Sequence, residues 1–202
     1  MEIMMLGQSR RQGLARALEP AFVTPQHTWT FGEIESLSNR LAQGLKAHGI
    51  GHGDRVASLT KQTAHCVALT LAAQKLGAVS MPVNWRLAGP EIEYIIDNGQ
   101  AKLLMVDADF IATAKSAKLP TVQIMVCTTE AANGLESLQQ WAAQFQDEDP
   151  GFEPQPDDTS LQLYSSGTTG LPKGVELTHK SLGAAFLGPV PESIGYQGDG
   201  SV

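Results

Sequence analysis

The chain of 202 residues carries a formal net charge of −7, with 42% hydrophobic and 17% charged residues. This composition is typical of a globular protein with one sizeable hydrophobic core or two small ones. Lysine and arginine are scattered, with only Arg10 and Arg11 adjacent, so we expect no nucleic-acid-binding surface, because phosphate backbones are bound by clustered cations.

Helical and strand patterns alternate along the chain. The expected helices cover residues 9–18, 31–48, 63–76, a segment beginning at Gly89, and the region around 135–145; the expected strands cover 55–59, 78–83, 103–106, 122–127, 161–164 and 174–178, with a small hairpin over 21–30. This alternation predicts an α/β fold with a mostly parallel sheet covered by helices. The acidic, proline-rich stretch 147–158 reads as a connection.

The helix over 31–48 has the clearest sequence signals. Thr30 and Glu33 form a Thr-x-x-Glu capping box at its start. Apolar residues then recur at three- and four-residue spacing, at Ile34, Leu37, Leu41 and Leu45. Gly49 supplies a left-handed stop. We therefore expect an amphipathic helix that buries one face.

Neither a membrane span nor a disulfide framework is expected. Cys66 and Cys127 lie in apolar runs without a CxxC pair or a cluster of metal ligands, which predicts two buried free thiols. The N-terminus lacks the order of a signal peptide, since its basic residues follow its apolar ones. The longest apolar region, 67–83, is interrupted by Gln74 and Lys75 and is too short to span a bilayer. These features predict a cytoplasmic protein without a transmembrane segment.

The stretch 163–174, LYSSGTTGLPKG, lies between two of the expected strands and is composed mostly of small residues. Its glycines allow backbone conformations closed to other residues and a close approach to a ligand. Its hydroxyl groups can donate to phosphate oxygens or bind magnesium, and Lys173 adds a mobile positive charge suited to a polyphosphate. The glycine and hydroxyl residues meant here are Ser165, Ser166, Gly167, Thr168, Thr169, Gly170 and Gly174. The combination predicts a site for an anion with several oxygens.

Two other interpretations of this loop fit less well. The Walker-type loop, G-x-x-x-x-G-K-[ST], requires glycine before the lysine and a hydroxyl residue after it, whereas Lys173 stands between Pro172 and Gly174. A flexible Gly/Ser/Thr linker tolerates any order of residues, whereas this loop has a defined Pro-Lys-Gly end between two strands. Both comparisons favour an ordered anion-binding loop.

The segment YSSGTTGLPKGVELTH resembles the signature phosphate loop of the adenylate-forming superfamily: acyl-CoA synthetases, luciferases and the adenylation domains of peptide synthetases. Two further segments are similar to that family in order and spacing, TWTFGEIESLSNRLAQGLKAHGIGHGDRVA and LAAQKLGAVSMPVNWRLAGPEIEYIIDNGQAKLLMVD. The similarity extends from about residue 8 to residue 182, and the Asn-Trp-Arg-Leu segment favours acyl-CoA synthetases over peptide-synthetase domains.

The resemblance implies a two-step reaction, in which a carboxylate attacks ATP to give an acyl-adenylate and pyrophosphate, and a thiol, usually that of coenzyme A, then takes the acyl group. It implies that the loop contacts the ATP phosphates through Ser165, Ser166, Gly167, Thr168, Thr169, Gly170 and Lys173. The first hydroxyl of the loop, Ser165, stands where the family usually has a threonine linked to Mg²⁺. The expected ligands are thus a carboxylic acid, ATP, Mg²⁺ and coenzyme A.

Three other candidates are expected to be structural. His179 follows the second strand of the loop and could act as a base, but it is better explained as a structural residue beside a helix that Thr178 caps. Asp54 and Arg55 read as a turn aspartate next to an arginine whose stem lies along the surface. The pair at 85–86, Trp-Arg, reads as scaffold. His48, His52 and His65 are dispersed and form no metal site.

The resemblance further implies that residues 1–202 are the first part of the family's large N-terminal domain, with the phosphate loop at 165–174 and the C-terminal domain outside the chain. The adenine- and ribose-binding segments and the adenylation lysine are not in these residues, so we expect the chain alone to be inactive. A non-catalytic nucleotide- or partner-binding protein and an amino-acid-activating domain stay open as alternatives. If later strands of the sheet lie outside the chain, an edge strand and apolar faces are left uncovered, so we expect self-association.

Overall fold

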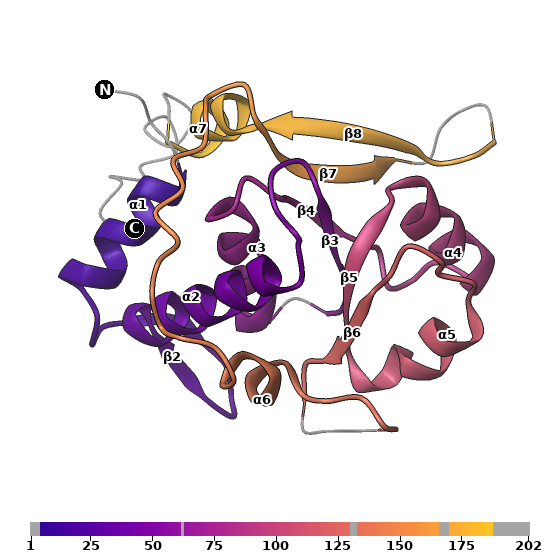
Figure 1. The fold of residues 1–202 in the computed structure, drawn as a ribbon, viewed down its shortest axis with the longest axis horizontal. Coiled ribbons are helices and arrows are strands. Elements are labelled where there is room, and N and C mark those ends of the chain that lie inside the picture. Colours follow the sequence, from indigo (N-terminus) through magenta and orange to yellow (C-terminus); the bar gives the residue numbers. More distant parts are fainter. Residues whose placement is uncertain (1–4, 62, 130–132, 166–169, 188–202) are drawn as a thin grey trace.

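A computed structural model describes residues 5–61, 63–129, 133–165 and 170–187 (Figure 1). In chain order the elements are α1 (Met5–Ala15), β1 (Pro20–Val23), β2 (Thr28–Thr30), α2 (Phe31–Ala47), β3 (Arg55–Leu59), α3 (Ala64–Gln74), β4 (Val79–Pro82), α4 (Gly89–Asn98), β5 (Ala101–Val106), the 3-10 helix η1 (Ala108–Phe110), α5 (Ile111–Ser116), β6 (Ile124–Cys127), α6 (Leu138–Ala142), β7 (Thr159–Ser165), β8 (Lys173–Thr178) and α7 (His179–Leu187).

The main sheet has six strands in the order β6-β5-β3-β4-β7-β8. The first five strands pair in parallel, and β7 pairs with β8 in antiparallel fashion. Strands β1 and β2 form a separate antiparallel hairpin. The expectation of an α/β fold with a mostly parallel sheet is therefore confirmed, and the one antiparallel pair of the six-stranded sheet is the hairpin that carries the glycine-rich loop.

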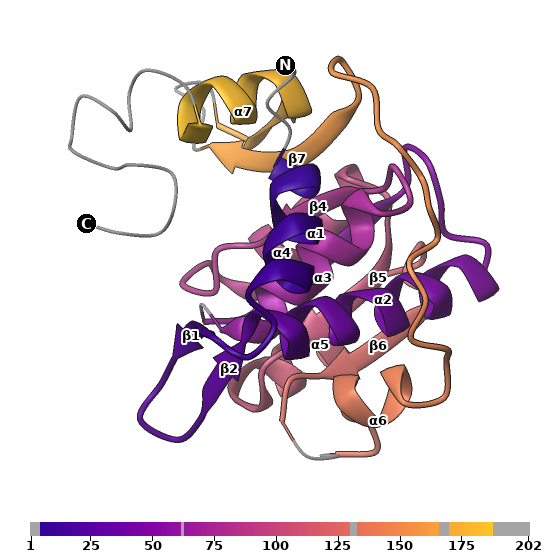
Figure 2. The same ribbon diagram turned by 90° about the vertical axis from the view of Figure 1, so that its left-hand side faces the viewer.

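Successive residues of the central strands serve two separate cores, because side chains alternate between the faces of a sheet. Val56 and Leu103 pack with α2, α3 and α6 in one cluster. Ala57 and Leu104 pack with α4 and α5 in the other. Helix α1 lies against α2 and reaches α7 (Figure 2). Strands β3, β5 and β6 each contribute to both clusters, and burying one leucine side chain contributes about 2 kcal/mol.

Helix α2 forms as its sequence predicts. Glu33 N–H donates to Thr30 Oγ1 at 3.2 Å, and Thr30 N–H donates to Glu33 Oε2 at 2.8 Å. Gly49 has φ +70° after the last turn. These reciprocal bonds satisfy two of the N–H groups that a helix start leaves without partners.

Several predicted boundaries were wrong, and one short helical segment was not anticipated. Helix α1 covers residues 5–15 rather than 9–18, because Leu6 is its buried anchor, whereas Leu14 and Leu18 are 84% and 93% exposed. Helix α6 covers only Leu138–Ala142, and it begins at Leu138 because Ser137 caps it, accepting from Gln140 N–H at 3.1 Å. The segment 108–116, which forms η1 and α5, is too short for a reliable periodic pattern.

Strand β8 is the outer strand of the sheet, and its hairpin exposes apolar side chains. Val175 is 46% exposed and Leu163 is 39% exposed. Such an edge can pair with another chain, and self-association stays a prediction. Among the described helices, none has the length and apolar character needed to cross a membrane.

We predict that Gly44→Ala destabilises the protein although it improves helix propensity. Alanine is favoured over glycine within a helix by about 1 kcal/mol. A Cβ atom at Gly44 would, however, lie 2.6 Å from Trp141 Cη2 and 2.7 Å from Phe145 Cε2. Overpacking of this kind costs about 2 kcal/mol, so the free energy of unfolding in urea should fall by about 1 kcal/mol net.

Gly7→Ala is the matched control, because the nearest atom to its Cβ would be Arg11 Nη1 at 3.6 Å. This variant should be neutral or slightly stabilising. A Gly44→Ala protein as stable as Gly7→Ala would show that α6 can move away from α2 without cost.

Candidate functional site

The glycine-rich loop connects the two strands of the β7–β8 hairpin. In the antiparallel register Ser165 is the partner of Lys173, and Leu163 is the partner of Val175. Because alternate residues share a face, Ser165 and Lys173 project from the same face of the hairpin, and both are exposed. Gly170, in the loop, has φ +113°, a conformation that favours glycine.

The structure thus brings together the first and last of the predicted phosphate-binding residues. Of the residues between them, Ser166, Gly167, Thr168 and Thr169 lie outside the described residues, and Gly170 is exposed. Lys173 begins strand β8 and not a helix, which agrees with the rejection of a Walker-type loop. Helix α7 begins after β8, where Ser181 N–H donates to Thr178 Oγ1 at 3.2 Å, so Thr178 caps it as predicted.

A cavity of about 710 Å³ opens beside this hairpin, at the carboxyl ends of the parallel strands. Strands β4 and β7 are joined only at Ser80 and Leu161. Beyond that pair Pro82 has no N–H to donate, and the two strands separate. Leu71 of α3 and Leu163 of β7 contribute to a mostly apolar wall. Ligands of open parallel sheets bind at such crevices, so this cavity is part of the candidate site.

One polar group of the cavity wall is buried without a partner. Gln74 is 2% exposed, and its Nε2 donates to Ser160 Oγ at 2.8 Å. Its Oε1 has no hydrogen-bond partner within the described residues.

A second hollow of about 690 Å³ lies beside α4 and the segment after α5. We assign the candidate site to the first cavity, because only that one is lined by strand ends and by the hairpin.

Trp85 and Arg86, which the sequence predicted to be scaffold, pack against neighbours and also line the cavity. The ring centroid of Trp85 lies 5.8 Å from that of Phe110, and the Arg86 guanidinium lies 4.2 Å from the Trp85 ring centroid. Both residues also line the cavity, as does Cys66. Cys127 is buried as expected, but Cys66 is only partly buried, because it lies in the first turn of α3 facing this opening, 2.8 Å from Thr60 Oγ1.

The remaining candidates have structural surroundings. His179 is 1% exposed, and neither ring nitrogen has a hydrogen-bond partner among the described residues. Burial lowers the pKa of His179. Asp54 accepts from Gly51 N–H at 3.0 Å in a turn and pairs with Lys102 at 2.8 Å. In the described part of the chain no group of three or more His, Cys, Asp or Glu residues could hold a metal ion.

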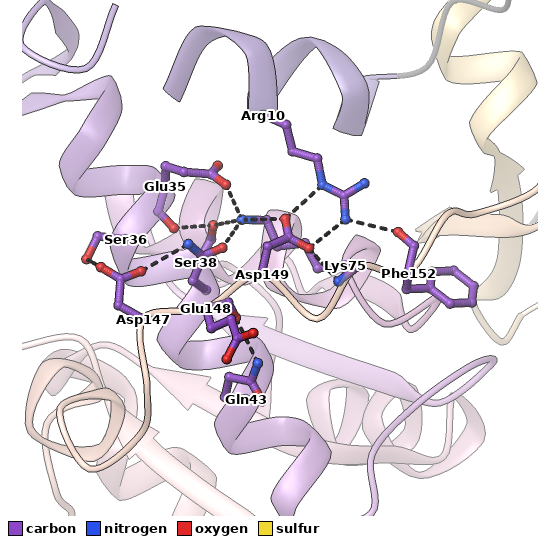
Figure 3. Close-up of polar contacts among 12 residues, drawn as sticks. Arg10, Glu35, Ser36, Ser38, Gln43, Lys75, Asp147, Glu148, Asp149 and Phe152 are labelled. Carbon is purple, nitrogen blue, oxygen red and sulfur yellow. Dashed lines mark hydrogen bonds and ion pairs between the residues drawn. The ribbon is translucent and has the colours of Figure 1, made fainter. Parts of the chain in front are cut away.

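A buried polar network holds the segment that leads into β7 (Figure 3). Lys75, whose side chain is completely buried, donates to Glu35 Oε1 at 2.6 Å, to Ser38 Oγ at 2.9 Å and to Asn39 Oδ1. Its Nζ also lies 3.6 Å from Asp149 Oδ2. The lysine that interrupts an apolar helix in the sequence is therefore the centre of an ion cluster.

Arg10 of α1 completes the network from the other side. Its guanidinium donates to both carboxylate oxygens of Asp149 at 2.8 and 2.7 Å, to Glu153 Oε1 at 2.6 Å and to Phe152 C=O at 3.0 Å. The stretch 147–153 was predicted only as a connection. The structure shows that it crosses α2 in fixed contact with α1 and α3 before the chain enters β7.

The charges of this network determine the ionisation of Asp149. Burial would raise its pKa, but the hydrogen bonds from Arg10 and from Gly151 N–H and the nearby charges of Lys75 and Arg10 outweigh it, so that the pKa of Asp149 lies below its usual value. Opposite charges and donated hydrogen bonds both favour the carboxylate form.

The comparison with known proteins identifies the family. Residues 10–198 match the AMP-binding enzyme family, and the chain belongs to this family of adenylate-forming enzymes. It is 37% identical over 163 residues to the fatty acid–[acyl-carrier-protein] ligase ScoC of Streptomyces coeruleorubidus, covering 80% of this chain and 30% of that protein. It is 35% identical over 180 residues to the 3-hydroxybenzoate–CoA ligase of Aromatoleum sp. (strain CIB), covering 87% and 34%.

Solved structures show the same fold. The anthranilate CoA ligase AuaEII in complex with anthranoyl-AMP superposes with a TM-score of 0.82 at 29% identity, over 89% of this chain and 36% of that one. The N-terminal domain of FACL13 from Mycobacterium tuberculosis superposes with a TM-score of 0.77 at 32% identity, over 89% and 45%. The chain spans about a third of the length of the curated relatives it matches.

We predict that Asp149→Asn destabilises the protein at pH 7 by about 2 kcal/mol, the range for hydrogen bonds to charged groups. The folded-state pKa of Asp149 is lowered, so its contribution is complete above the unfolded pKa of about 4. It is lost as the pH falls through the lower folded value. Urea unfolding at pH 7 and pH 3 should show the difference between wild type and variant shrinking at pH 3.

Asp157→Asn is the control, since it neutralises an exposed carboxylate of the same segment. Its effect should stay within about 0.5 kcal/mol. An Asp149→Asn penalty of the same size at both pH values would mean that the carboxylate charge does not stabilise the network.

Proposed function

We propose that this chain supplies the phosphate-binding part of an enzyme that activates a carboxylic acid with ATP and transfers the acyl group to a thiol. The observation that carries the proposal is the pairing of Ser165 with Lys173 at the loop end of a hairpin whose strand β7 also lines the cavity. Membership in the AMP-binding family supports it. The proposed phosphate contacts are Ser165, Ser166, Gly167, Thr168, Thr169, Gly170 and Lys173.

In the first step an oxygen of the substrate carboxylate bonds to the α-phosphorus of ATP. The bond from that phosphorus to the oxygen bridging to the β-phosphate breaks, and pyrophosphate leaves. In the second step the thiolate sulfur bonds to the acyl carbon and AMP leaves. Lys173 and the loop hydroxyls bind the β- and γ-phosphates, where they stabilise the negative charge that develops on pyrophosphate.

We propose that Mg²⁺ binds together with ATP at the loop. The described residues offer no cluster of acidic, histidine or cysteine side chains to hold the ion. An Mg²⁺ ion bound with ATP commonly takes several of its ligands from phosphate and water. The exposed hydroxyl of Ser165, at the end of β7, is the group that we propose as the contribution of this chain.

The names of the relatives support two classes of acid and two acceptors. ScoC is a fatty acid–[acyl-carrier-protein] ligase, and the Aromatoleum and Thauera enzymes act on hydroxybenzoates with CoA. We therefore propose a fatty or aryl carboxylic acid as substrate and coenzyme A as the acceptor. Two free cysteines agree with a reducing, cytoplasmic compartment.

We predict that the 202-residue chain binds inorganic tripolyphosphate in the presence of Mg²⁺ and that Lys173→Met weakens this binding about tenfold. The variant removes one charge-assisted contact worth about 1.5 kcal/mol. Isothermal titration calorimetry measures both affinities. Lys180→Met is the control, because it removes an exposed lysine of the neighbouring helix α7. Equal weakening by both variants would indicate attraction by net charge instead of a site.

We predict that the same chain does not catalyse ATP–pyrophosphate exchange with any fatty, aryl or amino acid. The chain covers about a third of its relatives, and we propose that the adenine and ribose contacts come from the remaining length. Binding of tripolyphosphate without exchange is the expected pair of results. Robust exchange would show that these residues suffice, and the acid that supports it would distinguish an acyl-CoA synthetase from an amino-acid-activating enzyme.

A further inference from the structure

The spatial match between Ser165 and Lys173 depends on the register of one antiparallel pair. A slip of β8 by one residue relative to β7 would move every β8 side chain to the opposite face. Lys173 would then project away from Ser165. Near the loop, the apolar side chains on the Ser165 face specify this register weakly, since Leu163 and Val175 are both more than a third exposed. At this end of the hairpin, the contacts that specify the β7–β8 register must therefore come mainly from the opposite face.

Arg55 makes the decisive contacts on that opposite face. It begins strand β3, and its Nε donates to Gln162 Oε1 at 3.0 Å while its Nη2 donates to Glu176 Oε1 at 2.6 Å. Gln162 of β7 and Glu176 of β8 are direct partners in the register. One planar guanidinium thus binds both members of a single cross-strand pair, and a slipped hairpin would separate them.

Two further features fix the guanidinium and the hairpin. Arg55 Nη1 donates to Gly53 C=O at 2.9 Å, which holds the side chain against the turn before β3. On β7, Tyr164 OH accepts from Gln162 Nε2 at 3.2 Å and donates to Asn98 Oδ1 at 2.6 Å at the end of α4. The contacts therefore connect both strands of the hairpin to the rigid parallel part of the sheet.

Gly174 allows this arrangement because it has no side chain. It is the register partner of Tyr164, and a Cβ atom there would lie 2.6 Å from Gln162 Nε2 and 3.2 Å from Tyr164 Cζ. A larger residue would push Gln162 away from Arg55. The requirement for glycine directly after Lys173 thus comes from the face of the hairpin that the phosphate does not reach.

We infer that Arg55, acting through Gln162 and Glu176, is a positioning residue for phosphate binding that fixes the β7–β8 register and so keeps Lys173 opposite Ser165. This inference rests on the proposed function of the loop. Arg55 itself lies at the amino end of β3, whereas the cavity lies at the carboxyl ends of the strands, so its effect is indirect.

The test compares Arg55→Ala with a charge-swapped double variant, Arg55→Glu with Glu176→Arg. The swap restores an ion pair across the same gap, and the Gln162 amide can turn to donate instead of accept. Lys102→Ala is the matched control: its side chain is 32% exposed against 31% for Arg55, and it loses an ion pair with Asp54 of 2.8 Å. Glu176→Gln is a milder variant that keeps the side-chain shape.

Two measurements are made on the whole chain: titration with tripolyphosphate and Mg²⁺, and hydrogen–deuterium exchange of residues 159–165 and 173–178. Arg55→Ala should bind about fivefold more weakly, the equivalent of one partly exposed ion pair. Its hairpin amides should exchange faster, with those of β3 and β5 unchanged. The swap should restore both properties, and Lys102→Ala should change neither.

Arg55→Ala with wild-type affinity and wild-type exchange would overturn the inference. If Arg55→Ala fails to fold, Glu176→Gln decides by the same two measurements. A wild-type chain that does not bind tripolyphosphate would contradict the proposed function of the loop. The exchange of 173–178 would then decide alone whether Arg55 fixes the register.

Discussion

A single buried charge sets the arrangement of the helices on one side of the sheet. The ammonium group of Lys75 has no access to solvent, and an unpaired charge in that position would cost several kcal/mol. Its partners come from α2 and from the stretch 147–153, and Arg10 of α1 closes the cluster. The connecting segment places Asp149 between Lys75 and Arg10, so that one carboxylate contacts charges from both sides.

The buried network around Lys75 also affects the candidate site, because the segment that it holds continues into the hairpin. The segment that the network holds leads directly to β7, and β7 forms one strand of the hairpin that carries the loop. From there the register places Ser165 opposite Lys173. The site is therefore positioned from two directions, by the ion cluster along the chain and by the Arg55 contacts across the sheet. Neither set of contacts involves the proposed phosphate-binding residues themselves.

The sequence predicted the fold class, the capped helix α2 and the positions of the main strands along the chain, because these follow from local periodicity and from glycine and proline signals. It also predicted the two strands that flank the glycine-rich loop, whereas phosphate binding by that loop stays a prediction. It did not show that these strands pair in antiparallel fashion, that Lys75 and Asp149 meet, or that Trp85 and Cys66 share a cavity wall. These are contacts between residues far apart in the chain, and composition and spacing carry no information about them.

Pro82 has a consequence for how a ligand would enter. Successive N–H groups of a strand point to alternate neighbours, and Val83 N–H donates to Ser58 C=O of β3, so the donor missing at Pro82 is the one that would face β7. The next rung of the ladder therefore lacks one of its two hydrogen bonds, which disfavours closure of the gap between β4 and β7. The crevice is thus preorganised: a ligand would not have to separate two paired strands, and the free energy of its contacts would not be spent on opening the protein.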